Sequence, residues 1–194
     1  MSDELTTVPS QYVAQAKLFT FLGNAFQIYD TSGGLQFYIK QKAFKLREAI
    51  RVYKDEAQTE ERLSIQARSV MDFSTTYDVT DTITGEDLGS ARRKGLKSLF
   101  KDEWELLSPG GDVVGAVSET GGILSILRRF INALKFIPQK YEVTIDGQLE
   151  GLIDQRFAFF RATYDVDFTP GGKLDPRMGV AVVVLLLAIE SRQD

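Results

Sequence analysis

The stretch MGVAVVVLLLAI, from Met178 to Ile189, decides the fold, because its twelve residues carry no charge. A helix that is apolar on every side must be surrounded completely, either by lipid or by protein. Twelve helical residues extend about 18 Å, whereas the hydrocarbon core of a bilayer is about 30 Å thick. The sequence therefore predicts a buried central helix over 175–190 and no transmembrane span, with a membrane anchor as the alternative.

Four valines in this stretch would also suit a β-strand. A helix is favoured because the stretch is longer than the usual strand of about 4–8 residues. In addition, Asp175-Pro176 places a good capping residue directly before a proline at the first helical position.

The residues before this helix alternate between apolar and polar side chains in short runs that are separated by turn residues. Such a period-2 pattern predicts half-buried β-strands. We expect twelve strands, at 12–20, 24–29, 35–40, 47–54, 63–70, 77–83, 88–94, 104–107, 113–117, 141–145, 148–153 and 159–168. At 123–136 the apolar residues instead follow a helical spacing, which predicts one amphipathic helix.

Twelve antiparallel strands and one apolar helix predict a mainly β fold, in which a closed barrel surrounds the helix. Closure removes exposed sheet edges, and a barrel of this size is too wide for side chains alone to fill. Because no linker or repeat divides the chain, we expect a single domain over 1–194, with residues 1–11 as a flexible lead.

The order of these elements resembles the LURP-one-related branch of the tubby C-terminal-like superfamily, which also contains the phospholipid scramblases. The resemblance covers roughly residues 12–190, and it rests on a set of short motifs. These are LFTFLGNAFQIYD at 18–30, FYIKQK at 37–42, DLG at 87–89 with RRK at 92–94, DEW at 102–104, and LDPR at 174–177. The resemblance implies a twelve-stranded barrel that encloses the C-terminal helix, but it implies no single activity, because a shared fold can host different functions.

The composition excludes several classes of chemistry. The 194 residues carry a net charge of -4 and include neither cysteine nor histidine. They therefore lack a thiol nucleophile, a thiolate metal site and the usual general base near neutral pH. The negative charge also disfavours nucleic-acid binding. We expect a non-enzymatic protein that uses no cofactor. The acidic, polar start is unlike a signal peptide and predicts a cytoplasmic protein, peripheral at a membrane if it binds lipid.

Two basic segments are candidates for binding anionic phospholipid. The first surrounds the end of a predicted strand and contains Arg92, Arg93, Lys94, Lys97 and Lys101. Tubby proteins bind phosphoinositide headgroups through basic side chains on the barrel surface, so the resemblance favours this segment. The second is the amphipathic helix, which would suit a membrane interface and contains Arg128, Arg129 and Lys135. The alternatives are a solvated hairpin end and a helix that packs on the barrel.

Three carboxylates just before the central helix, Asp165, Asp167 and Asp175, are candidate calcium ligands. Calcium favours clustered carboxylates, and the scramblases have a proposed calcium-binding segment in the corresponding region. The alternative is that Asp167 points outward from a strand and that Asp175 only caps the helix.

Taken with the resemblance, these features predict a binding or scaffold module that recognises anionic phospholipid at a membrane surface. Phospholipid scrambling is one alternative. The other is a lipid-independent domain that binds a protein partner.

Overall fold

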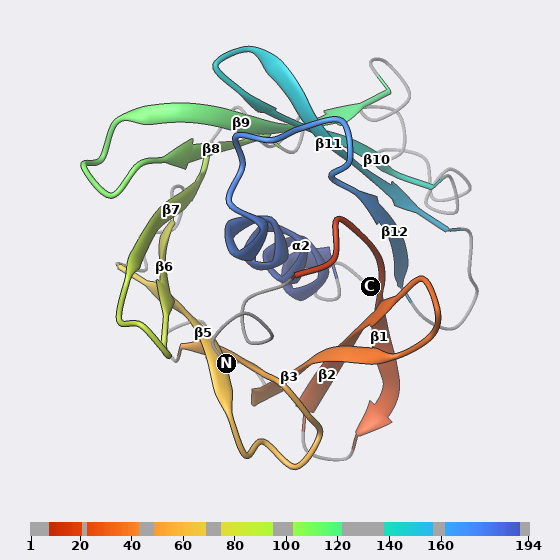
Figure 1. Ribbon diagram of the computed structural model, residues 1–194. Coiled ribbons are helices and arrows are strands. Elements are labelled where there is room, and N and C mark those ends of the chain that lie inside the picture. The colour runs from red at the N-terminus through yellow and green to blue at the C-terminus, as the bar shows by residue number, and fades with distance from the viewer. Residues whose placement is uncertain are drawn as a thin grey trace.

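The computed structural model of the chain is a closed barrel of twelve antiparallel β-strands around one helix (Figure 1). The structure describes residues 8–20, 23–42, 49–68, 75–94, 103–121, 138–156 and 162–190. The strands are β1 (Gln11–Thr20), β2 (Gly23–Asp30), β3 (Leu35–Lys42), β4 (Ile50–Tyr53), β5 (Glu61–Ala67), β6 (Thr76–Asp81), β7 (Asp87–Arg93), β8 (Glu103–Leu107), β9 (Val113–Thr120), β10 (Lys140–Ile145), β11 (Gln148–Gln155) and β12 (Thr163–Asp167).

Each strand pairs with its neighbours in the chain, and β1 closes the barrel by pairing with β12 as well as with β2. The predicted closed barrel of twelve strands is therefore confirmed. Several strands end earlier than predicted, and among them β6 stops at Asp81 instead of continuing to Ile83. The reason is that Asp81 Oδ1 accepts hydrogen bonds from the N–H groups of Ile83 and Thr84, at 2.8 and 3.1 Å, which turns the backbone.

The apolar C-terminal stretch forms α2 (Pro176–Glu190), which confirms the predicted helix against the competing strand. Asp175 caps it as expected, because Asp175 Oδ1 accepts the N–H of Arg177 at 2.8 Å. All side chains from 178 to 188 are buried, and Val183 and Val184 are completely buried. Burial contributes about 1.5–3 kcal/mol for each larger side chain, so the helix supplies a substantial part of the core.

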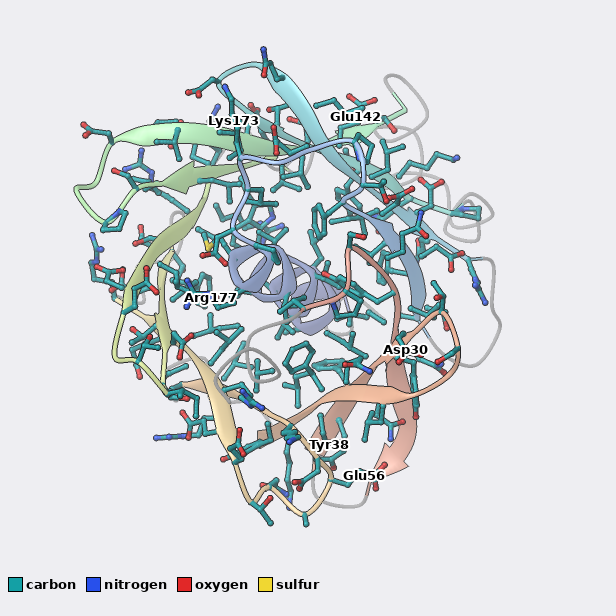
Figure 2. All side chains as sticks on the ribbon, in the orientation of Figure 1. Asp30, Tyr38, Glu56, Glu142, Lys173 and Arg177 are labelled. Atoms are coloured by element: carbon teal, nitrogen blue, oxygen red, sulfur yellow. The ribbon has the colours of Figure 1, made fainter. Side chains whose placement is uncertain are left out.

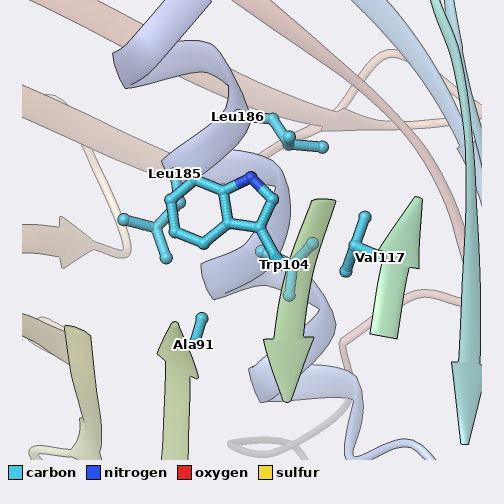
Figure 3. A pocket seen from close by; sticks show the side chains of 6 residues that line it. Ala91, Trp104, Val117, Leu185 and Leu186 are labelled. Carbon is cyan, nitrogen blue, oxygen red and sulfur yellow. The ribbon is translucent and has the colours of Figure 1, made fainter. Parts of the chain in front are cut away.

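The inner wall of the barrel packs directly against α2. Its fully buried aliphatic and aromatic side chains include Phe26, Ile28, Ile39, Val52, Ile65, Val79, Val117, Val143 and Ile153. Figure 3 shows Trp104 of β8 against Leu185 and Leu186 of α2. The side chains at this contact leave no room for a water molecule. The strand residues and the helix thus form one continuous core.

A close contact fixes the start of α2 to the wall. The ring of Phe168 lies beside two glycines, Gly151 of β11 and Gly179 of α2. A Cβ atom would lie 2.1 Å from the ring at Gly151 and 2.8 Å from it at Gly179, closer than any real contact. Only glycine at these two positions admits the ring.

Successive connections of an antiparallel barrel alternate between its two ends. The end where α2 begins contains the connections 31–34, 54–60, 82–86, 108–112, 146–147 and 168–175, and all of them are described. The opposite end is the one where α2 finishes. The helix predicted at 123–136 lies outside the described residues, as do residues 1–7 of the predicted lead, whereas Val8 packs against the core.

Candidate functional site

Acidic side chains gather at the end of the barrel where α2 begins. Every connection at this end contains an Asp or Glu or directly adjoins one. These acids are Asp30, Asp55, Glu56, Glu60, Glu61, Asp81, Glu86, Asp87, Asp112, Asp146, Glu150, Asp167 and Asp175. The basic residues at the same end are Lys54, Arg62, Lys173 and Arg177. Acids clearly outnumber bases there, and we call this end the acidic end.

Arg177, in the first turn of α2, lies among three of these carboxylates (Figure 2). Its guanidinium is 2.6 Å from Asp81, 2.7 Å from Asp175 and 2.9 Å from Glu86. Burial tends to raise the pKa of Asp81, but hydrogen bonds from Arg177 and from two backbone N–H groups outweigh it and hold this pKa below its ordinary value. The hydrogen bond to Asp175 in turn raises the pKa of Arg177. This cluster ties the start of α2 to the β6–β7 turn.

Glu150 of β11 holds the connection that leads into α2. Its Oε2 atom accepts hydrogen bonds from the N–H groups of Gly172, Lys173 and Leu174, at 2.8, 2.8 and 3.1 Å. Burial raises the pKa of Glu150, yet the three N–H groups outweigh it and lower the pKa overall. The most buried acids of the acidic end therefore have a structural task, which is to fix α2 in the barrel.

The predicted basic residues Arg92, Arg93 and Lys94 lie where β7 reaches the opposite end of the barrel. Arg92 donates two hydrogen bonds to Glu105 of β8, at 2.6 and 2.8 Å, and Lys94 donates one to Glu103 at 2.8 Å. The bond from Arg92 lowers the pKa of Glu105, and the bond to Glu103 raises the pKa of Lys94. All four paired side chains remain 20–39% exposed, so the cluster stands on the outer surface.

The other candidates for lipid binding, Lys97, Lys101, Arg128, Arg129 and Lys135, lie outside the described residues and stay predictions. The strands that flank them can be placed. Lys94 N–H donates to the Glu103 carbonyl where β7 gives way to β8, and Thr120 lies opposite Lys140 where β9 gives way to β10. Both pairs of strand ends lie at the end opposite the acidic end.

The three candidate calcium ligands each have a protein partner. Asp165 accepts hydrogen bonds from Arg156, and Asp167 accepts them from Gln11 and from the N–H of Thr169. Asp175 caps α2 and pairs with Arg177. In the part of the chain that the structure describes, no three carboxylates form a group that could hold a metal ion.

The sequence did not reveal the acidic partners of Arg92 and Lys94. Glu103 and Glu105 alternate with the buried Trp104, and this period-2 pattern could have placed both on the outer face. Sequence reasoning also missed Lys140, the first residue of β10, whose Nζ atom lies 3.1 Å from Asp154. The only signal for Lys140 was its position just before an alternating run.

No helix in the described ranges is both long enough and apolar enough to cross a membrane. The family model for LURP-one-related proteins matches residues 10–187, nearly the whole chain. No curated protein and no solved structure matches it. The chain belongs to the LURP-one-related family.

Proposed function

We propose that this member of the LURP-one-related family is a non-enzymatic binding module that recognises anionic phospholipid at a membrane surface. The observation that carries the proposal is the position of Arg92 and Lys94, whose side chains meet beside Glu105 on the outer face, at the end of the barrel opposite the acidic end. Each basic side chain near an anionic membrane contributes about 1 kcal/mol to binding.

The carboxylates of Glu103 and Glu105 do not prevent such an interaction. Their pairs with Lys94 and Arg92 are partly exposed to solvent, and exposed ion pairs contribute only about 0–1 kcal/mol. A headgroup phosphate can therefore replace a carboxylate beside the guanidinium or ammonium group at little cost. Arginine is especially suited to this exchange, because its planar fork binds phosphate in two places.

The non-enzymatic part of the proposal is supported by the interior of the barrel. Helix α2 fills the described core, so a ligand would bind at the outside. The absence of cysteine and histidine from the sequence removes thiol nucleophiles and the commonest general base.

Co-sedimentation of the full chain with neutral and with anionic liposomes, across a salt series, tests the proposal. We expect binding only to anionic vesicles, weakened as the salt concentration rises. The double variant Arg92→Gln/Lys94→Gln should bind markedly more weakly. The matched control is Lys54→Gln/Lys173→Gln, which removes two exposed cations from the acidic end; Lys173 also pairs with a carboxylate, that of Asp146. The control should bind like the unmodified protein.

Other outcomes would overturn the proposal in favour of a stated alternative. Salt-insensitive binding to both kinds of vesicle would point to apolar anchoring. Exchange of labelled lipid between the two leaflets of reconstituted vesicles would favour scrambling. No binding to either vesicle would favour a protein-interaction domain.

A further inference from the structure

The charges of the barrel are distributed unevenly along its axis. At the acidic end, the side chains of Glu56, Glu86, Asp87, Asp112 and Asp146 are exposed. On the outer face towards the opposite end, in contrast, opposite charges pair across neighbouring strands, as in Arg68–Asp78, Lys140–Asp154 and Arg156–Asp165. The described part of the opposite end is therefore nearly neutral locally, and the excess of negative charge among the described residues is concentrated at the acidic end.

We infer that the barrel binds an anionic bilayer end-on, with the acidic end facing away from the lipid and Lys140 among the residues that face it. This inference rests on the proposed function and specifies the geometry of the same interface. Lys140 is suited to the role because it begins β10 at the end opposite the acidic end and its side chain is 63% exposed.

Screening explains why the orientation matters. The fifteen residues of α2 extend about 22 Å along the barrel. The Debye length is about 10 Å at 0.1 M salt, so charges at the acidic end would interact little with the membrane in the end-on orientation. A barrel that lay on its side would bring exposed carboxylates close to anionic headgroups, and like-charge repulsion would oppose that arrangement.

Two lysines provide a matched test of the orientation. Lys140 and Lys173 lie at opposite ends, are 63% and 48% exposed, and each has its Nζ atom 3.1 Å from one aspartate (Lys173 is labelled in Figure 2). We expect Lys140→Gln to weaken binding to phosphatidylserine-containing vesicles about fivefold at low salt. Lys173→Gln should leave binding unchanged. Equal losses for the two variants would overturn the end-on orientation.

A second measurement reports the orientation directly. The chain contains no cysteine, so a single introduced cysteine can carry an environment-sensitive fluorophore without background labelling. Thr31→Cys places the label in an exposed turn at the acidic end, and Pro138→Cys places it at an exposed site beside β10. On anionic vesicles, the label at position 138 should become shielded from aqueous iodide, while the label at position 31 stays accessible.

The outcomes separate this inference from the proposed function. Binding that shields both labels equally would overturn the end-on orientation alone. A complete failure of the unmodified protein to bind anionic vesicles would overturn the proposed function and the orientation together.

Discussion

Arg177 and Arg92 lie in two parts of the molecule where arginine–carboxylate ion pairs have different roles. Arg177 is 19% exposed and lies against Asp81, whose side chain is only 6% exposed. Arg92 is 39% exposed and lies against Glu105, which is 20% exposed. A buried carboxylate that loses its partner remains in a poorly solvated place, whereas an exposed one regains water. The first cluster should therefore hold the fold together, and the second should remain available for exchange with a ligand.

The largest expected effect comes from removing the buried cation. Arg177→Ala should lower the free energy of unfolding by about 3–5 kcal/mol, because it leaves Asp81 buried without its charged partner. Urea unfolding followed by circular dichroism would measure the change.

Arg92→Ala is the matched control for this variant, because it also removes one arginine from a carboxylate pair. We expect a loss below about 1 kcal/mol. Similar losses for the two variants would show that burial does not distinguish the clusters.

A second prediction concerns how α2 is anchored. Glu150→Ala should destabilise the protein by about 1.5–3 kcal/mol, because three N–H groups of the β12–α2 connection lose a charged acceptor. Glu150→Gln should recover part of that loss, since its amide oxygen can still accept hydrogen bonds. Glu142→Ala, at an exposed position on the neighbouring strand β10, should change stability by no more than about 0.5 kcal/mol. A loss at Glu142 as large as that at Glu150 would contradict the anchoring role.

Acid should weaken the Arg177 cluster in a defined direction. Despite burial, which raises it, the pKa of Asp81 in the folded protein lies below 3.8, because Arg177 and backbone N–H groups bind its carboxylate. The unfolded chain therefore takes up protons first as the pH falls. The stability that Asp81 contributes is fully present above its unfolded pKa and is lost as the pH drops through the lower, folded pKa.

Urea unfolding at a series of pH values from 7 down to 2.5 would measure this loss. Asp81→Asn should be less stable at neutral pH and should show a smaller further decline in acid. An unchanged acid dependence in this variant would assign the decline to other carboxylates.

The sequence was sufficient for the parts of this fold that depend on local patterns. Alternation located the strands, and the uninterrupted apolar stretch located α2 because no polar face was available to meet water. The Asp175 cap was also predictable from a local pattern, because its carboxylate accepts a hydrogen bond from a backbone N–H only two residues away. Closure of the barrel then followed from the number of strands and from the need to enclose the helix.

Contacts between distant residues could not be predicted in this way. Arg177 and Asp81 are 96 positions apart, and they meet only because the closed barrel carries the β6–β7 turn to the start of α2. The pairing of Arg92 with Glu105 depends on the register of β7 and β8, which the long segment between those strands leaves undetermined. The basic stretch was therefore visible in the sequence, whereas its acidic partners were not. Its role in lipid binding stays a proposal.

The smallest expected effect concerns those acidic partners. If Arg92 and Lys94 bind headgroup phosphates, Glu103 and Glu105 compete with the lipid for the same cations. Glu105→Gln should then strengthen binding to anionic vesicles by up to about fivefold, and Glu103→Gln should act in the same direction. The free energy of unfolding should change by less than about 1 kcal/mol, because both pairs are partly exposed.

Asp112→Asn is the control for this gain, because it removes one exposed negative charge at the acidic end. If binding depends only on the net charge of the protein, Asp112→Asn and Glu105→Gln should strengthen it equally. If the carboxylate of Glu105 competes locally for Arg92, only Glu105→Gln should do so, and the gain should disappear when Arg92→Gln is added. A gain that persists without Arg92 would mean that Glu105 acts by general repulsion and that Arg92 does not contact the lipid.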